Sequence, residues 1–212
     1  MKTFHGLFLI QILILILVTN NIYGQTPFGT EKVKNVDNLF VDCSEVTNIS
    51  WMEYLYFLKI EYGENSPQYK AAVPDTTLTG YSFKHPTYRN YPVVGITYDQ
   101  ALAYARWRTK AANIILEQSC KKYRYEYLLA SEEVLQQAFS QQKSKLGQLS
   151  ALQAVTSKKM VHIDDNAKEI TSDKTIVIGA QGEQLTFEPY QKPDAATSFR
   201  CMARVVKCVK TK

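Results

Sequence analysis

One junction decides how the chain folds: residues 91–101 have the sequence YPVVGITYDQA, an apolar run followed at once by a helix start. Residues 93–97 are predicted to form a short apolar strand. Thr97 and Gln100 have the spacing of a capping box, in which each side chain satisfies a backbone N–H group of the other residue. We therefore expect a helix to begin here and to continue to about Leu116.

Further elements are predicted on both sides of this junction. An earlier helix is indicated by a stripe of apolar residues at helical spacing, and Gly63 ends it. The members of that stripe are Trp51, Tyr54, Leu55, Leu58 and Tyr62. The other expected elements are extended chain over 33–47, strands over 123–129, 175–178, 185–190 and 199–209, and a third helix after Ser131 with Val134, Leu135, Ala138 and Phe139 on its buried side.

Residues 1–24 are predicted to be a signal peptide. They combine one basic residue, Lys2, with a short apolar run and a small residue, Gly24, before the expected cleavage point. The apolar run is shorter than the roughly 20 residues that a membrane span needs. We therefore expect an exported protein, periplasmic or at the cell surface or secreted, with no membrane span after signal removal. The alternative is an uncleaved N-terminal anchor.

The size and charge of the chain limit the classes of protein that it can represent. Its 212 residues, 45% of them hydrophobic, are enough for one domain with a real core. The formal net charge is +5, but the basic residues are scattered in short, separate groups. A nucleic-acid surface would need them concentrated in one stripe, so no nucleic-acid partner is expected.

The four cysteines, Cys43, Cys120, Cys201 and Cys208, all lie in the exported part. An even number in an oxidising compartment predicts two disulfides. Two cysteines seven positions apart on one strand would be about 23 Å apart, far beyond the roughly 7 Å that a disulfide spans. If Cys201 and Cys208 share the last strand, each pairs elsewhere, and two connectivities remain.

Residues 64–92 form a long stretch rich in proline and in aromatic side chains. A loop of this length is either packed by its own side chains or used as a binding surface. As a binding surface its candidates are Tyr81, His85, Tyr88, Arg89 and Tyr91, because tyrosine and arginine are enriched at interfaces.

Three blocks in one order resemble a known family. They are DCSEVTN with WMEYL (42–48 and 51–55), YPVVGITYDQA with AYARWRT (91–101 and 103–109), and SFRC (198–201). Together they resemble the formylglycine-generating-enzyme, or sulfatase-modifying-factor, domain over about residues 40–203. The chain is most similar to the branch found in gliding-motility lipoproteins of Bacteroidetes. Residues 127–133, YLLASEE, look like a degraded version of a further family segment.

The resemblance implies a fold and a domain division. It implies an α+β, C-type-lectin-like fold in a reduced version, with about three helices and a small, mostly antiparallel sheet. We expect an N-terminal extension over 25–39 and the domain over 40–209. The blocks have structural causes at helix starts, so they indicate fold more than activity.

The resemblance also bears on chemistry. Active members of this family are oxidases that use a pair of cysteines to bind copper, and thiolates suit Cu(I). The interval 133–200, where that pair would lie, contains no cysteine, so we predict no catalytic residue, no cofactor and no metal site. By the same resemblance the disulfides would be Cys120–Cys201 and Cys43–Cys208. A His162, Asp164 and Asp165 group is taken as solvated loop.

The main hypothesis is an exported, non-catalytic binding or structural module of the bacterial envelope, with protein partners in the envelope or among secreted proteins. Gliding or secretion machinery is the setting that the resemblance suggests. Two alternatives stay open. One is an enzyme of the copper-oxidase type with a relocated site, and the other is a lectin-like module that binds sugars.

Overall fold

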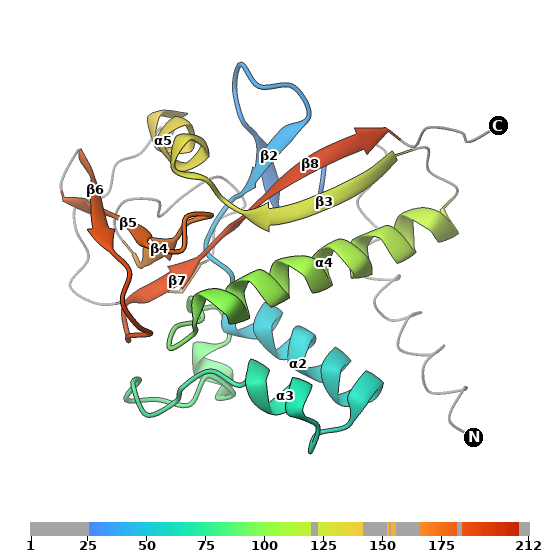
Figure 1. Ribbon diagram of the computed structural model, residues 1–212, viewed down its shortest axis with the longest axis vertical. Helices are drawn as coiled ribbons and strands as arrows, with labels where there is room; N and C mark the ends of the chain where they lie inside the picture. The colour runs from blue at the N-terminus through green and yellow to red at the C-terminus, as the bar shows by residue number, and fades with distance from the viewer. Residues whose placement is uncertain are drawn as a thin grey trace.

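The computed structural model describes residues 26–119, 123–141, 152, 154–155, 166–181 and 184–207. Helices and strands combine in it without a regular alternation, which confirms the α+β class (Figure 1). No helix in the described part of the chain is both long and apolar enough to cross a membrane.

The described strands form two four-stranded sheets. The first has the order β1-β2-β8-β3 and is antiparallel throughout. Its strands are β1 (Thr30–Lys32), β2 (Leu39–Asp42), β8 (Cys201–Lys207) and β3 (Tyr123–Leu129). The second has the order β6-β5-β4-β7, in which only β4 and β7 run parallel. Its strands are β4 (Lys168–Ile170), β5 (Ile176–Gln181), β6 (Gln184–Pro189) and β7 (Thr197–Phe199).

The described helices are α2 (Asn48–Tyr62), α3 (Pro67–Ala72), α4 (Tyr98–Gln118) and α5 (Glu132–Gln141), with the 3₁₀-helix η1 (Pro86–Tyr88). Helix α4 packs on one face of the first sheet and α5 on the opposite face (Figure 1). Helix α4 runs along β3, and α2 with α3 lies on the far side of α4 from the sheet (Figure 1). The main core lies between α2, α4 and the sheet, where Trp51 stacks on Tyr104 at 5.4 Å between ring centroids.

The helix boundaries follow the local signals in the sequence. The capping box is confirmed: Gln100 N donates to Thr97 Oγ1 at 3.1 Å, and Thr97 N donates to Gln100 Oε1 at 2.7 Å. Gly63 ends α2 with φ 89°, a conformation that glycine adopts without the steric penalty of a Cβ. The strands predicted at 123–129, 175–178 and 185–190 are confirmed as β3, β5 and β6.

Several predictions were wrong. Residues 93–97 are not a strand, because Gly95 adopts φ 72° and pairing is limited to one bridge between Thr47 and Pro92. The stretch 64–92 contains α3, which begins after a Ser66 cap, and η1. The last strand is two strands, β7 and β8, interrupted at Arg200. Tyr62, expected on the buried stripe of α2, is 48% exposed.

Candidate functional site

The backbone of the aromatic loop, residues 81–91, is fixed to the first turn of α2. Three of its carbonyl groups accept hydrogen bonds from that turn. Asn48 N donates to Tyr91 O at 2.9 Å, Ile49 N donates to Arg89 O at 2.8 Å, and Asn48 Nδ2 donates to Tyr88 O at 2.9 Å. The free N–H groups of a helix start are thereby satisfied by the loop, so the loop has a defined backbone.

The rings of this loop contact one another. Tyr81 and Tyr88 are stacked, with 4.1 Å between centroids, and Tyr88 meets Tyr91 edge to face at 5.3 Å. His85 lies 5.9 Å from Tyr88, and its Nδ1 accepts a hydrogen bond from Thr87 N. The structure therefore brings four of the five predicted binding residues into one cluster.

The fifth residue, Arg89, stands on the surface beside them. Arg89 and His85 are exposed, whereas the three tyrosines are half-buried. Tyr81 Oη and Asn48 Oδ1 are both buried, and the Asn48 side chain partly offsets the effect of burial on the Tyr81 hydroxyl. Burial raises the pKa of Tyr81 above its ordinary value, so the hydroxyl stays protonated. The cluster thus combines packed rings with an exposed guanidinium and an exposed imidazole.

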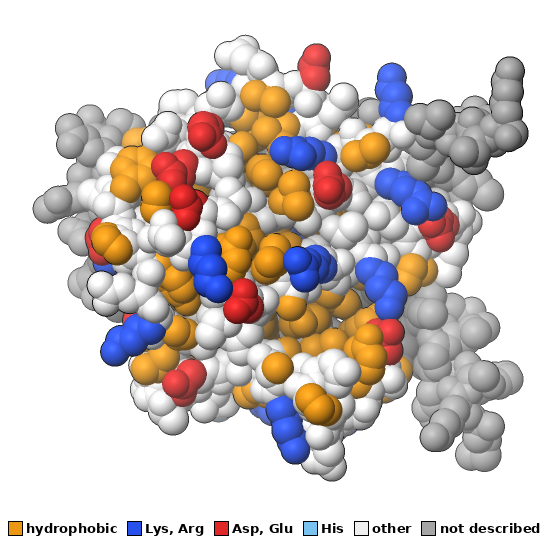
Figure 2. Space-filling model, in the orientation of Figure 1, with side chains coloured by type: hydrophobic (Ala, Val, Ile, Leu, Met, Phe, Trp, Pro, Cys, Tyr) orange, Lys and Arg blue, Asp and Glu red, His pale blue; other side chains and the backbone are white. Residues whose placement is uncertain are grey.

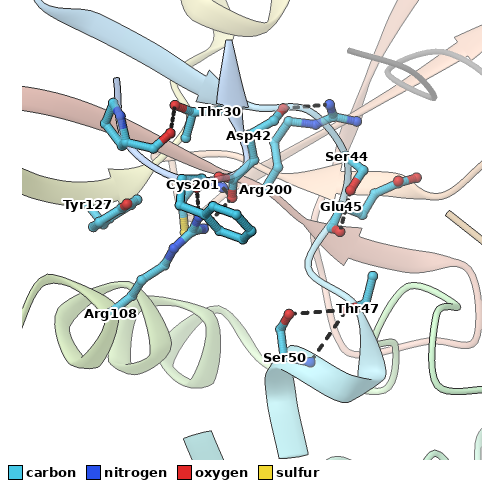
Figure 3. Close-up of polar contacts among 12 residues, drawn as sticks. Thr30, Asp42, Ser44, Glu45, Thr47, Ser50, Arg108, Tyr127, Arg200 and Cys201 are labelled. Atoms are coloured by element: carbon cyan, nitrogen blue, oxygen red, sulfur yellow. Dashed lines mark hydrogen bonds and ion pairs between the residues drawn. The ribbon is translucent and has the colours of Figure 1, made fainter. Parts of the chain in front are cut away.

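A second polar cluster lies inside the molecule, where β7 meets β8. The Arg200 side chain is fully buried and donates from Nε and Nη2 to both carboxylate oxygens of Glu169, at 2.6 to 2.9 Å. Arg200 Nη1 also donates to the backbone carbonyl of Asp42 at 3.1 Å (Figure 3). This ion pair is fully buried, and it was not predicted from the sequence.

Two more acidic groups surround this pair. Arg108 reaches from α4 to the Asp42 carboxylate at 2.6 Å, with its guanidinium 4.2 Å from the centre of the Tyr127 ring (Figure 3). Glu45 is 1% exposed, and its Oε2 has no hydrogen-bond partner. Burial, with a further contribution from Glu169, raises the pKa of Glu45 to about 8, while Arg200 opposes the shift. Glu45 is therefore protonated at neutral pH.

The two described cysteines, Cys43 and Cys201, are free and buried. Burial raises the pKa of the Cys43 thiol to about 11 and that of Cys201 to about 12. The pKa of the Cys201 thiol is influenced by Asp42 of β2 and Arg108 of α4, whereas that of the Cys43 thiol is influenced by Glu31 and Arg200 as well as Asp42. Thiolate is the reactive form of cysteine, so both groups have the character of structural thiols.

Each disulfide pair that the resemblance implied includes one cysteine that lies outside the described residues, Cys120 or Cys208. Both pairs therefore stay predictions.

Other candidate sites are weaker. Within the described ranges no group of three His, Cys, Asp or Glu side chains could hold a metal ion. The group of His162, Asp164 and Asp165 lies outside those ranges. A shallow pocket of about 180 Å³ beside β6 has a lining of mixed charge, which includes Lys168, Glu188, Lys192 and Asp194. On the face drawn in Figure 2, basic and acidic side chains are likewise interspersed.

The fold and the buried ion pair define a mixed α+β domain whose described thiols are shielded from solvent. The family model of the sulfatase-modifying factor enzyme 1-like domain matches residues 14–172. This match covers most of the chain, and the protein belongs to that family. The match ends before the SFRC segment at 198–201. No curated protein and no solved structure matches the chain.

Proposed function

We propose that this protein is a non-catalytic binding module of the sulfatase-modifying-factor type, and that the aromatic loop is its contact surface. The observation that carries the proposal is the anchoring of the loop: three carbonyls are bonded to the first turn of α2, while Arg89 and His85 stay exposed. A loop that is ordered before binding loses little conformational entropy when a partner arrives.

The state of the thiols argues against the oxidase alternative. A copper-dependent oxidase needs two thiolates that face one site. Cys43 and Cys201 are buried and their pKa values are raised, and among the described charged groups Asp42 is the one that influences both of them. The sequence between 133 and 200 supplies no further cysteine.

The ring geometry argues against the sugar-binding alternative at this loop. Tyr81 and Tyr88 stack on each other, Tyr91 meets both of these rings in an edge-to-face arrangement, and all three tyrosines are half-buried. A sugar ring that stacks on a tyrosine requires a free face. Export, an envelope location and a role in gliding or secretion machinery remain part of the proposal, supported by the composition of residues 1–24 and by the family resemblance.

The test is affinity purification from the native envelope with a Tyr88→Ala/Arg89→Ala variant. The matched control is Tyr56→Ala/Arg106→Ala, which removes an exposed tyrosine and an exposed arginine from α2 and α4. The proposal expects partners that the native chain and the control retain and the loop variant loses. Retention of every partner by the loop variant would overturn it.

A further inference from the structure

The aromatic loop lies in the longest part of the described chain without an acidic residue. No Asp or Glu occurs between Asp75 and Asp99, whereas Lys84, His85 and Arg89 fall within this interval. All three of these side chains are exposed. The Lys84 ammonium lies 5.8 Å from the centre of the Phe83 ring. Lys84 also helps to lower the pKa of Glu64, but the Glu64 carboxylate already forms an ion pair with Lys59 at 2.6 Å. The loop therefore exposes two cationic side chains, Lys84 and Arg89, and contains no acidic residue of its own.

The backbone of the loop holds these cations in place. Arg89 follows η1 directly, and its N–H donates to Pro86 O while its carbonyl accepts from Ile49 N. His85 caps the start of η1. Lys84 and Arg89 thus flank η1 along the chain, and both side chains are exposed.

We propose that this loop binds an acidic segment of a partner polypeptide. This inference rests on the proposed function, because it names the kind of partner that the loop accepts. Carboxylates of the segment pair with Lys84 and Arg89, and the planar guanidinium of Arg89 can hold one carboxylate through two hydrogen bonds. Apolar groups of the segment contact the ring edges of Tyr88 and Tyr91. A polypeptide fits better than an anionic polysaccharide, because the stacked tyrosines leave few free ring faces.

The probe is a fluorescein-labelled peptide of ten glutamates, titrated with the purified chain and followed by fluorescence anisotropy. The test variant is Lys84→Glu/Arg89→Glu. The control variant, Arg106→Glu/Lys192→Glu, changes the net charge equally at exposed positions away from the loop. Unlabelled dextran sulfate and a peptide of ten lysines serve as competitors.

We expect the loop variant to bind the peptide at least tenfold more weakly, which is about 1.4 kcal/mol, and the control to differ from the native chain by less than threefold. Binding should weaken with salt. If both variants lose the same affinity for the peptide, the binding depends only on net charge. If dextran sulfate displaces the peptide from the native chain and binds the loop variant more weakly, the ligand is a polysaccharide. Either result overturns the inference. Neither result contradicts the proposed function if the Tyr88→Ala/Arg89→Ala variant loses its partners in the envelope purification.

Discussion

The guanidinium of Arg200 holds both carboxylate oxygens of Glu169 at a point where neither side chain has any exposed surface. Arg200 lies between β7 of the second sheet and β8 of the first, and Glu169 lies in β4, so the pair forms at the junction of the two sheets. Buried charges are tolerated only when their partners are in place, because the desolvation cost is large. The ion pair is therefore expected to contribute to the stability of this junction.

Replacing Glu169 by Gln should lower the free energy of unfolding by about 3–5 kcal/mol, because Arg200 would keep its charge with a neutral partner. Urea unfolding measures the change. The control is Glu117→Gln, which breaks the exposed pair between Glu117 and Arg124 and should cost about 1 kcal/mol or less. Similar costs for the two variants would contradict the role given to the buried pair.

Glu45 should make stability depend on pH. Its pKa rises from 4.5 in the unfolded chain to about 8 in the folded protein, chiefly through burial. The folded state therefore keeps a proton that the unfolded state loses, and this contribution to stability falls as the pH rises from about 4.5 to about 8.

The Glu45→Gln variant is neutral at every pH and removes this dependence. Relative to the native chain, its free energy of unfolding should increase with pH by up to about 1.4 kcal/mol for each pH unit in that window. Urea unfolding of both proteins at pH 5, 6.5 and 8 gives the difference. A difference that is constant across the three pH values would show that Glu45 is ionised in the fold.

The outer edge of β3 is closed by two side chains of α4. Thr109 Oγ1 and the Asn113 amide bond the backbone N–H and C=O groups of Tyr127 and Tyr125, at 2.8 to 3.3 Å. These side chains stand in for a neighbouring strand. An open edge strand pairs readily with other chains, so the contacts both stabilise the sheet and prevent self-association.

A Thr109→Val/Asn113→Leu variant should lose about 2–4 kcal/mol of unfolding free energy, because it removes four hydrogen bonds. It should also associate with itself as concentration rises. Urea unfolding and light scattering across a concentration series test the two effects. Ser140→Ala, which removes one exposed hydrogen bond to Gln137, is the control and should change neither. If the double variant stays monomeric at every concentration, Thr109 and Asn113 do not protect the edge of β3 against self-association.

The buried thiols should resist modification. With pKa values of about 11 and about 12, Cys43 and Cys201 contain little thiolate at pH 8. Labelling by iodoacetamide, followed for each peptide by mass spectrometry, should be at least about 100-fold slower in the native protein than in urea. Rapid native labelling of either residue would contradict their burial and revive the oxidase alternative.

Parts of the fold were predictable because their causes are local. The start of α4 depends on Thr97 and Gln100, three residues apart, and the end of α2 depends on Gly63 alone. The alternation in β3 likewise needs only neighbouring residues. The sequence of residues 81–91 shows that the loop is rich in aromatic side chains. It does not show that Asn48 and Ile49 donate hydrogen bonds to the backbone of the loop.

The order of residues by itself determined where most helices and strands form, since capping, turn and periodicity signals act within a few positions of the chain. Tertiary structure alone decided which charges are buried and which strand edges are closed. Arg200 meets Glu169 and the Asp42 carbonyl across 31 and 158 positions, and Thr109 meets Tyr127 across 18. Such contacts depend on how whole elements pack, and the desolvation that makes them decisive exists only after packing has removed the water.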